Sequence, residues 1–191
     1  MASMMQDWAV RGRAAAAGLL LFAGMAAGAH AQDNPCPNPI TGSALSAQFE
    51  LLSWSETDYV IQNEPGMKKV YDKIPANYQA QMQADPKAFP WGRVTQNRDQ
   101  ATLERVATLI HDARLRAVAG MLASLQWKSL QQVLARDSEF QAAAKHPKGT
   151  RLEEAARNPK SFDWKALFAG RNTCQLTALK QSAEAAGAKP L

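Results

Sequence analysis

One segment near the middle of the chain limits the fold more than any other. Residues 99–125, DQATLERVATLIHDARLRAVAGMLASL, carry apolar side chains at intervals of three and four residues. This spacing predicts a long amphipathic helix whose apolar face must be covered by other elements. The predicted apolar stripe consists of Leu103, Val106, Ala107, Ile110, Ala113, Ala117, Met121, Leu122 and Leu125.

The rest of the chain shows the same type of pattern. Helical spacing recurs on both sides of this segment, interrupted by turn signals such as NEPG at residues 63–66 and by a predicted loop at residues 84–92. Almost no segment alternates with period two, and there is no Asn-Gly or Asp-Gly hairpin turn. We therefore expect an all-α protein, a compact irregular helical bundle of about five to seven helices.

The N-terminus has the features of a secretory signal peptide. Arg11 and Arg13 precede the apolar run Ala14–Ala27, and Ala29-His30-Ala31 provides the small residues of a cleavage site before Gln32. A permanent membrane anchor is the alternative, which we disfavour because the run is short and rich in Ala and Gly. Residues 1–31 are thus expected to be a cleaved leader and residues 32–191 a single helical domain, without a transmembrane segment, in the periplasm or outside the cell.

The two cysteines lie near opposite ends of the mature chain. An exported protein enters a compartment where disulfides form and persist, so Cys36 and Cys174 are predicted to form one bond. The bond would tie the proline-rich segment 33–39 to the last helix. The alternatives are a reactive free thiol or a bond to another chain.

Charge is unevenly distributed along the mature chain. Residues 93–191 contain 16 basic and 9 acidic side chains, whereas residues 32–92 contain 4 and 7. A polarised surface can attract an acidic partner, but scattered charges of this kind more often form solvated helix faces. We expect no nucleic-acid binding, because no cluster of basic and aromatic residues is present.

The pair His111-Asp112 resembles the His-Asp dipeptide on a helix of secreted phospholipases A2, where His is a general base and Asp binds calcium. The resemblance covers these two residues, and the cysteines and the glycine-rich calcium loop of that family have no counterpart here. We interpret His111 instead as a residue at the edge of the apolar stripe, and we expect Asp112 to pair with Arg116 one turn later.

Other catalytic patterns give little support for an enzyme. Glu50, Glu56, Asp58 and Glu64 are interpreted as a solvated face, and no G-x-S-x-G, H-E-x-x-H or phosphate-binding glycine loop occurs. Secreted chorismate mutases are similar as exported all-α proteins, some with a disulfide, but their active-site positions could not be matched to this sequence. We expect no cofactor and no metal ion.

The stretch FPWGR is the best candidate for a binding feature. Phe89, Trp91 and Arg93 are residue types that often anchor interfaces, and Pro86 and Pro90 stiffen this part of the chain. The alternative is that the aromatic rings pack onto the bundle and cover it.

Two classes of function remain open at this point. The leading hypothesis is a non-enzymatic protein of the cell envelope that binds another protein, either as an immunity-type inhibitor or as an accessory subunit of a secretion or transport system. The alternative is a small helical enzyme, or a carrier of a lipid or other small ligand with its site in the bundle core. An apolar cavity with convergent polar groups would favour the second class, and an exposed aromatic patch would favour the first.

Overall fold

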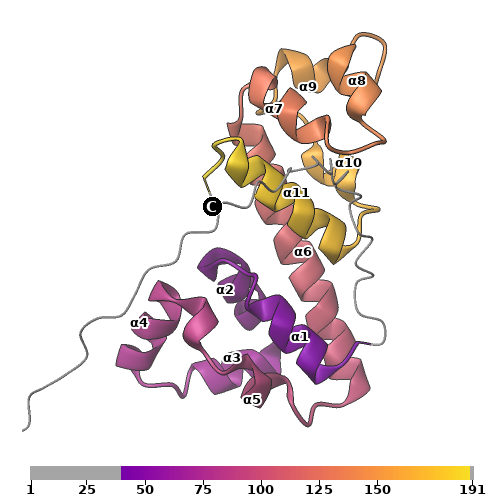
Figure 1. Cartoon of the computed structure of the whole chain (residues 1–191). Coiled ribbons are helices and arrows are strands. Elements are labelled where there is room, and N and C mark those ends of the chain that lie inside the picture. Colours follow the sequence, from indigo (N-terminus) through magenta and orange to yellow (C-terminus); the bar gives the residue numbers. More distant parts are fainter. Residues whose placement is uncertain (1–39, 190–191) are drawn as a thin grey trace, which may run out of the picture. The chain divides into compact units, whose positions relative to one another are not determined.

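The computed structural model describes residues 40–189, and every regular element within that range is helical (Figure 1). The all-α prediction is therefore confirmed for this part of the chain. Its α-helices are α1 (Gly42–Phe49), α2 (Trp54–Asn63), α3 (Pro65–Tyr71), α4 (Ala76–Ala84), α5 (Trp91–Thr95), α6 (Gln100–Ser124), α7 (Trp127–Leu134), α8 (Gln141–Lys145), α9 (Glu153–Arg157), α10 (Trp164–Phe168) and α11 (Thr173–Ala185), and a 3₁₀ helix, η1 (Pro86–Ala88), precedes α5.

The helices are more numerous and shorter than the five to seven predicted. The segment after Thr41 divides into α1 and α2 because the Ser53 side chain and the Glu56 carboxylate form a capping box that starts a new helix. The predicted loop at residues 84–92 contains η1 and the beginning of α5. There, Asp85 accepts a hydrogen bond from the Lys87 backbone N–H, and Pro86 occupies the first helical position, where its missing N–H has no consequence.

The long helix α6 agrees with its prediction. Asp99 caps it by accepting hydrogen bonds from the Thr102 backbone N–H at 2.9 Å and from the Thr102 hydroxyl at 2.7 Å. These bonds to the ionised form lower the pKa of the Asp99 carboxyl below its ordinary value. Every residue of the predicted stripe is buried except Ala107, which is half-buried.

Two apolar cores form along α6. The first, here called the N-terminal core, contains α6 residues up to Ala113 together with side chains of α1 to α5. The second, the C-terminal core, begins at Leu115 and includes side chains of α7 to α11. Arg114 lies between them in the sequence of α6 and is itself 1% exposed. The position where the two cores meet is therefore occupied by a buried charge.

Gly42 allows the start of α1 to approach the end of α5 closely. The Thr95 hydroxyl donates a hydrogen bond to the Gly42 carbonyl oxygen at 2.8 Å, and a Cβ at Gly42 would lie 2.6 Å from the Thr95 carbonyl oxygen. Because that oxygen belongs to the backbone, it cannot move aside without shifting a helix.

We predict that Gly42→Ala lowers the free energy of unfolding by about 1–3 kcal/mol, since the added methyl group forces α1 and α5 apart. Gly170→Ala is the matched control, because no atom lies within 4 Å of its Cβ position. Urea denaturation followed by circular dichroism measures both variants. Equal stability of the two would show that the α1–α5 contact is looser in solution.

The predicted disulfide and the boundary between leader and mature domain involve residues outside the described range. Cys174 is the second residue of α11 and is half-buried, whereas Cys36 is not among the described residues. The bond thus stays a prediction. None of the described helices is both long and apolar enough to cross a membrane.

The bond can be tested by thiol titration of the protein purified from the native host without reductant. We expect no titratable thiol, and we expect Cys36→Ser to lower the free energy of unfolding by about 2–4 kcal/mol while the helical circular dichroism signal persists. The signal should persist because the burial of α6 rests on contacts within residues 40–189. Two titratable thiols would contradict the bond.

Candidate functional site

An apolar groove with a volume of about 610 Å³ lies between α3, α4 and α5. Among the described residues, the large apolar side chains that are exposed are Val70 (39%), Tyr78 (56%) and Leu51 (51%), and the first two line this groove. The groove thus gathers apolar surface that packing within the described chain leaves open to solvent. Its lining consists of Val70, Ile74, Tyr78, Gln81, Met82, Asp85, Phe89, Pro90, Arg93, Val94 and Arg98.

The three predicted partner-binding residues differ in burial. Phe89 is half-buried and Arg93 is exposed, and both line the groove. Trp91 is 2% exposed: its ring stacks on Phe49 with centroids 4.3 Å apart, and its Nε1–H donates to the Pro86 carbonyl oxygen at 2.7 Å. A buried Trp91 cannot contact a partner, so a binding role for this stretch rests on Phe89 and Arg93.

The groove is bordered mainly by positive charge. Arg93 is exposed, and Arg98 is half-buried with its Nε–H donating to the Val94 carbonyl oxygen at 2.9 Å. Asp85 is the acidic side chain among the lining residues. An apolar surface with two guanidinium groups at its border is complementary to a segment that combines apolar and acidic side chains.

His111 and Asp112 lie away from this groove. The His111 Nε2 is 2.8 Å from the Arg171 carbonyl oxygen, which joins α6 to the segment before α11, and its Nδ1 is 3.6 Å from the Asp112 carboxylate. The expected ion pair between Asp112 and Arg116 is not formed among the described residues. Instead, the Arg116 guanidinium lies over the Tyr59 ring, 4.6 Å from its centroid. A histidine hydrogen-bonded to a backbone carbonyl in this way positions a loop.

The prediction of a solvated acidic face is wrong for two of its four residues. Glu50 is exposed and Asp58 is half-buried, but Glu56 is 2% exposed and Glu64 is 5% exposed. The Glu64 carboxylate caps α3 by accepting a hydrogen bond from the Met67 backbone N–H at 2.7 Å. Capping satisfies an otherwise unpaired helix donor.

Glu56 is the centre of a buried ion cluster that sequence reasoning missed. One carboxylate oxygen, Oε2, accepts hydrogen bonds from Lys180 Nζ at 2.6 Å, from the Ser53 backbone N–H at 2.7 Å and from the Ser53 hydroxyl at 2.8 Å. The other oxygen, Oε1, lies 3.2 Å from Arg114 Nε. Arg114 also donates through Nη2 to the Leu51 carbonyl oxygen at 2.9 Å. The cluster therefore joins α2, α6 and α11.

The charges of this cluster do not balance within the protein interior. Arg114 and Lys180, 1% and 6% exposed, share one buried carboxylate. Burial lowers the pKa of the Arg114 guanidinium below its ordinary value, and the carboxylates of Glu56 and Glu184 act in the opposite direction. Among the described residues, Glu56 Oε1 and Arg114 Nε face each other without a well-aligned hydrogen bond. The cluster is thus an ion pair with one additional buried cation.

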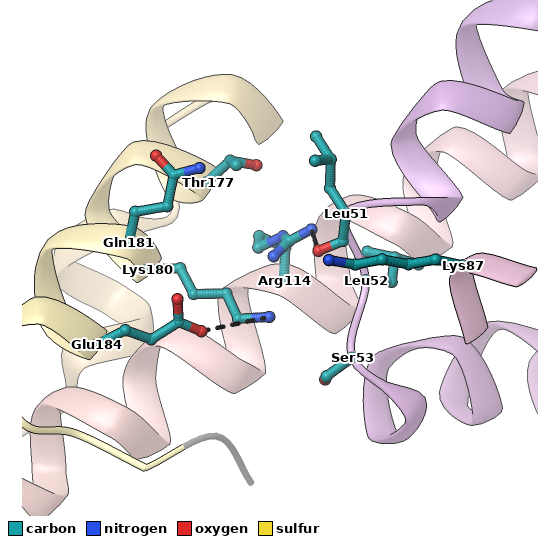
Figure 2. Close-up of a pocket in the computed structure, with 9 residues that line it drawn as sticks. All are labelled: Leu51, Leu52, Ser53, Lys87, Arg114, Thr177, Lys180, Gln181 and Glu184. Atoms are coloured by element: carbon teal, nitrogen blue, oxygen red, sulfur yellow. Dashed lines mark hydrogen bonds and ion pairs between the residues drawn. The ribbon is translucent and has the colours of Figure 1, made fainter. Parts of the chain in front are cut away.

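A pocket of about 280 Å³ opens beside the cluster (Figure 2). It lies between α11, the middle of α6 and the connection from α1 to α2. Its lining consists of Leu51, Leu52, Ser53, Lys87, Arg114, Thr177, Lys180, Gln181 and Glu184. A third cationic side chain, Lys87, therefore reaches the same space as Arg114 and Lys180. No group of three or more His, Cys, Asp or Glu side chains in residues 40–189 is arranged to hold a metal ion.

Comparison with known proteins identifies no family for this chain. No protein-family model, curated protein or solved structure matches the chain. The groove and the pocket beside the ion cluster are therefore the features that bear on function.

Proposed function

We propose that this protein is an exported, non-enzymatic binding protein that recognises another protein of the cell envelope through the groove between α3, α4 and α5. The observation that carries the proposal is that exposed Tyr78 and Val70 share one groove with Phe89 and Arg93. Aromatic and arginine side chains are the types that most often dominate the free energy of protein association. Contiguous apolar surface bordered by polar residues is typical of interaction sites.

The partner is expected to present an amphipathic segment with acidic residues. Its apolar side chains would cover Tyr78, Val70 and Phe89, and its carboxylates would face Arg93 and Arg98. A helix laid into a groove binds other proteins in this manner. An exported effector that this protein neutralises, or a larger secretion or transport assembly to which it belongs, could supply such a segment.

Location in the periplasm, or outside the cell, is part of the same proposal and is supported by the leader-like residues 1–31. The exported protein is expected to begin at Gln32. N-terminal sequencing of the protein from the periplasmic fraction tests this, and an intact Met1 in the membrane fraction would contradict export with cleavage.

The groove can be tested by site-specific photo-crosslinking in the periplasm of the native cells. A photoreactive side chain at Tyr78 is expected to capture a defined protein, and the same side chain at Leu51 serves as the matched control. Leu51 is similarly exposed, at 51% against 56%, but lies outside the groove. Arg93→Glu is expected to abolish the capture, because the new carboxylate repels acidic side chains of the partner.

The proposal is supported only if capture of the protein requires the groove residues. Equal capture from positions 78 and 51, or capture that Arg93→Glu leaves unchanged, would contradict a partner in the groove. The association rate should also fall as salt is added, since ions screen the attraction between Arg93, Arg98 and an acidic segment.

A further inference from the structure

We propose that the pocket beside the buried ion cluster binds a small organic anion that carries a carboxylate or phosphate group. This inference does not depend on the partner proposed for the groove, because the two sites share no lining residue. The charge, the hydrogen-bond donors and the location of the pocket support it.

Three cationic side chains converge on the pocket. Figure 2 shows the nitrogen-bearing ends of Lys87, Arg114 and Lys180 directed into one space, and all three line the pocket. Against these stand the Glu56 carboxylate, already in contact with two of them, and the Glu184 carboxylate, whose Oε1 is 4.0 Å from Lys180 Nζ. One positive charge is left over. Cations held close together in a partly buried site repel each other, and a bound anion would relieve that repulsion.

The pocket contains hydrogen-bond donors that contacts within residues 40–189 only partly use. Arg114 uses Nη2 for the Leu51 carbonyl oxygen, and its buried Nε lies 3.2 Å from Glu56 Oε1 without a well-aligned hydrogen bond. Lys87 forms no ion pair within residues 40–189. A planar guanidinium flanked by two ammonium groups is suited to the oxygens of carboxylates and phosphates, which accept charge-assisted hydrogen bonds from both groups.

The location of the pocket and the rest of its wall also suit a small organic ligand. It lies where the N-terminal core ends at Ala113 and the C-terminal core begins at Leu115, and ligand sites commonly occupy such junctions. Leu51 and Leu52 provide an apolar wall for carbon atoms of the ligand. Residues 177, 180, 181 and 184 follow the spacing of one face of α11, so this helix presents a hydroxyl, an ammonium, an amide and a carboxylate to the pocket.

Size and polarity together define the ligand class. A volume of about 280 Å³ is near the lower limit for small-molecule sites, which excludes a bulky ligand such as a lipid with full acyl chains. The expected ligand is therefore a compact organic acid or a phosphate ester. Because both carry the same kind of oxygens, the experiment includes one probe of each.

The test is calorimetric titration of the folded, exported protein with succinate, glycerol 3-phosphate and inorganic phosphate, each against sodium chloride of equal ionic strength. We expect saturable binding of at least one organic probe, with an affinity that Lys87→Ala weakens by about tenfold or more through loss of a charge-assisted contact. Lys69→Ala is the matched control, since Lys69 is an exposed lysine that does not line the pocket. It is expected to leave the affinity unchanged.

A second measurement reports on the buried group without any mutation. The NMR signal of the Arg114 Nε–H is expected to shift as the probe saturates the protein, because the anion enters the field of that guanidinium. Tyr78→Ser is expected to leave both readouts unchanged, which separates this site from the groove.

The binding results either support the proposed site or overturn it. Binding of succinate alone, or of glycerol 3-phosphate alone, supports the site and selects its ligand class. Equal weakening by Lys87→Ala and Lys69→Ala would overturn the assignment to this pocket. Absence of saturable binding by all three probes at about 10 mM, where a Kd of about 1 mM would give near saturation, would overturn the proposal itself.

Discussion

Replacing Glu56 by glutamine is expected to lower the free energy of unfolding by about 3–5 kcal/mol. Glutamine has nearly the same size and can still accept hydrogen bonds from Ser53, but it removes the negative charge that Arg114 and Lys180 share. Two buried cations would then face each other across a neutral amide. Urea denaturation followed by circular dichroism measures the effect.

Glu50→Gln provides the control, because Glu50 is an exposed carboxylate at the C-cap of α1, close in sequence to Glu56. Its effect is expected to stay within about 0.5 kcal/mol. Adding Lys180→Met to Glu56→Gln should recover part of the loss, since the double variant has one fewer uncompensated cation. A loss below about 1 kcal/mol for Glu56→Gln would indicate that water reaches the cluster and solvates Arg114 and Lys180 in place of the carboxylate.

Trp91→Ala is expected to lower the free energy of unfolding by about 3–5 kcal/mol, as is typical of removing a large aromatic side chain from a core. The ring stacks on Phe49 and packs edge-on against Phe89, with centroids 4.8 Å apart, so its removal leaves a cavity between α1 and α5. The Pro86 carbonyl oxygen also loses its donor. Thermal and urea denaturation both measure this loss.

Tyr78→Ala is the matched aromatic control, because Tyr78 is 56% exposed and its removal creates no buried cavity. We expect it to change stability by less than about 0.5 kcal/mol while weakening capture of a partner by the groove. The opposite result, a stable Trp91→Ala variant that no longer captures a partner, would show that Trp91 leaves the core in solution and would restore it as a partner-binding residue.

The secondary structure could largely be predicted from the sequence, because its determinants are local. The spacing of apolar residues from Leu103 to Leu125 is a property of neighbouring positions, and α6 forms where it predicts a helix. The absence of hairpin turns and of period-two alternation likewise predicted the all-helical fold. The number of helices was underestimated because a short break, such as residues 50–53 before Trp54, ends one helix and starts another without removing the apolar periodicity on either side.

The roles of the site residues could not be predicted from the sequence, because they depend on contacts between segments that are far apart in the chain. Phe89 and Trp91 are two positions apart in one short stretch, yet one lines a groove and the other is a core residue, because the Phe49 ring of α1 packs against the second. Glu56 has the capping-box spacing with Ser53, which predicts a helix start but not burial.

What the sequence determined by itself is therefore the helical class, the long helix α6 and the residues that its apolar stripe buries. Only the tertiary structure decided which charged side chains on these helices are buried and which partners they contact. Glu56 and Lys180 are 124 residues apart in the chain and belong to helices that pack on opposite cores, yet their side chains meet beside Arg114. The physical reason is that a buried charge is tolerated only where a distant partner compensates it, and the identity of that partner is set by how the helices pack.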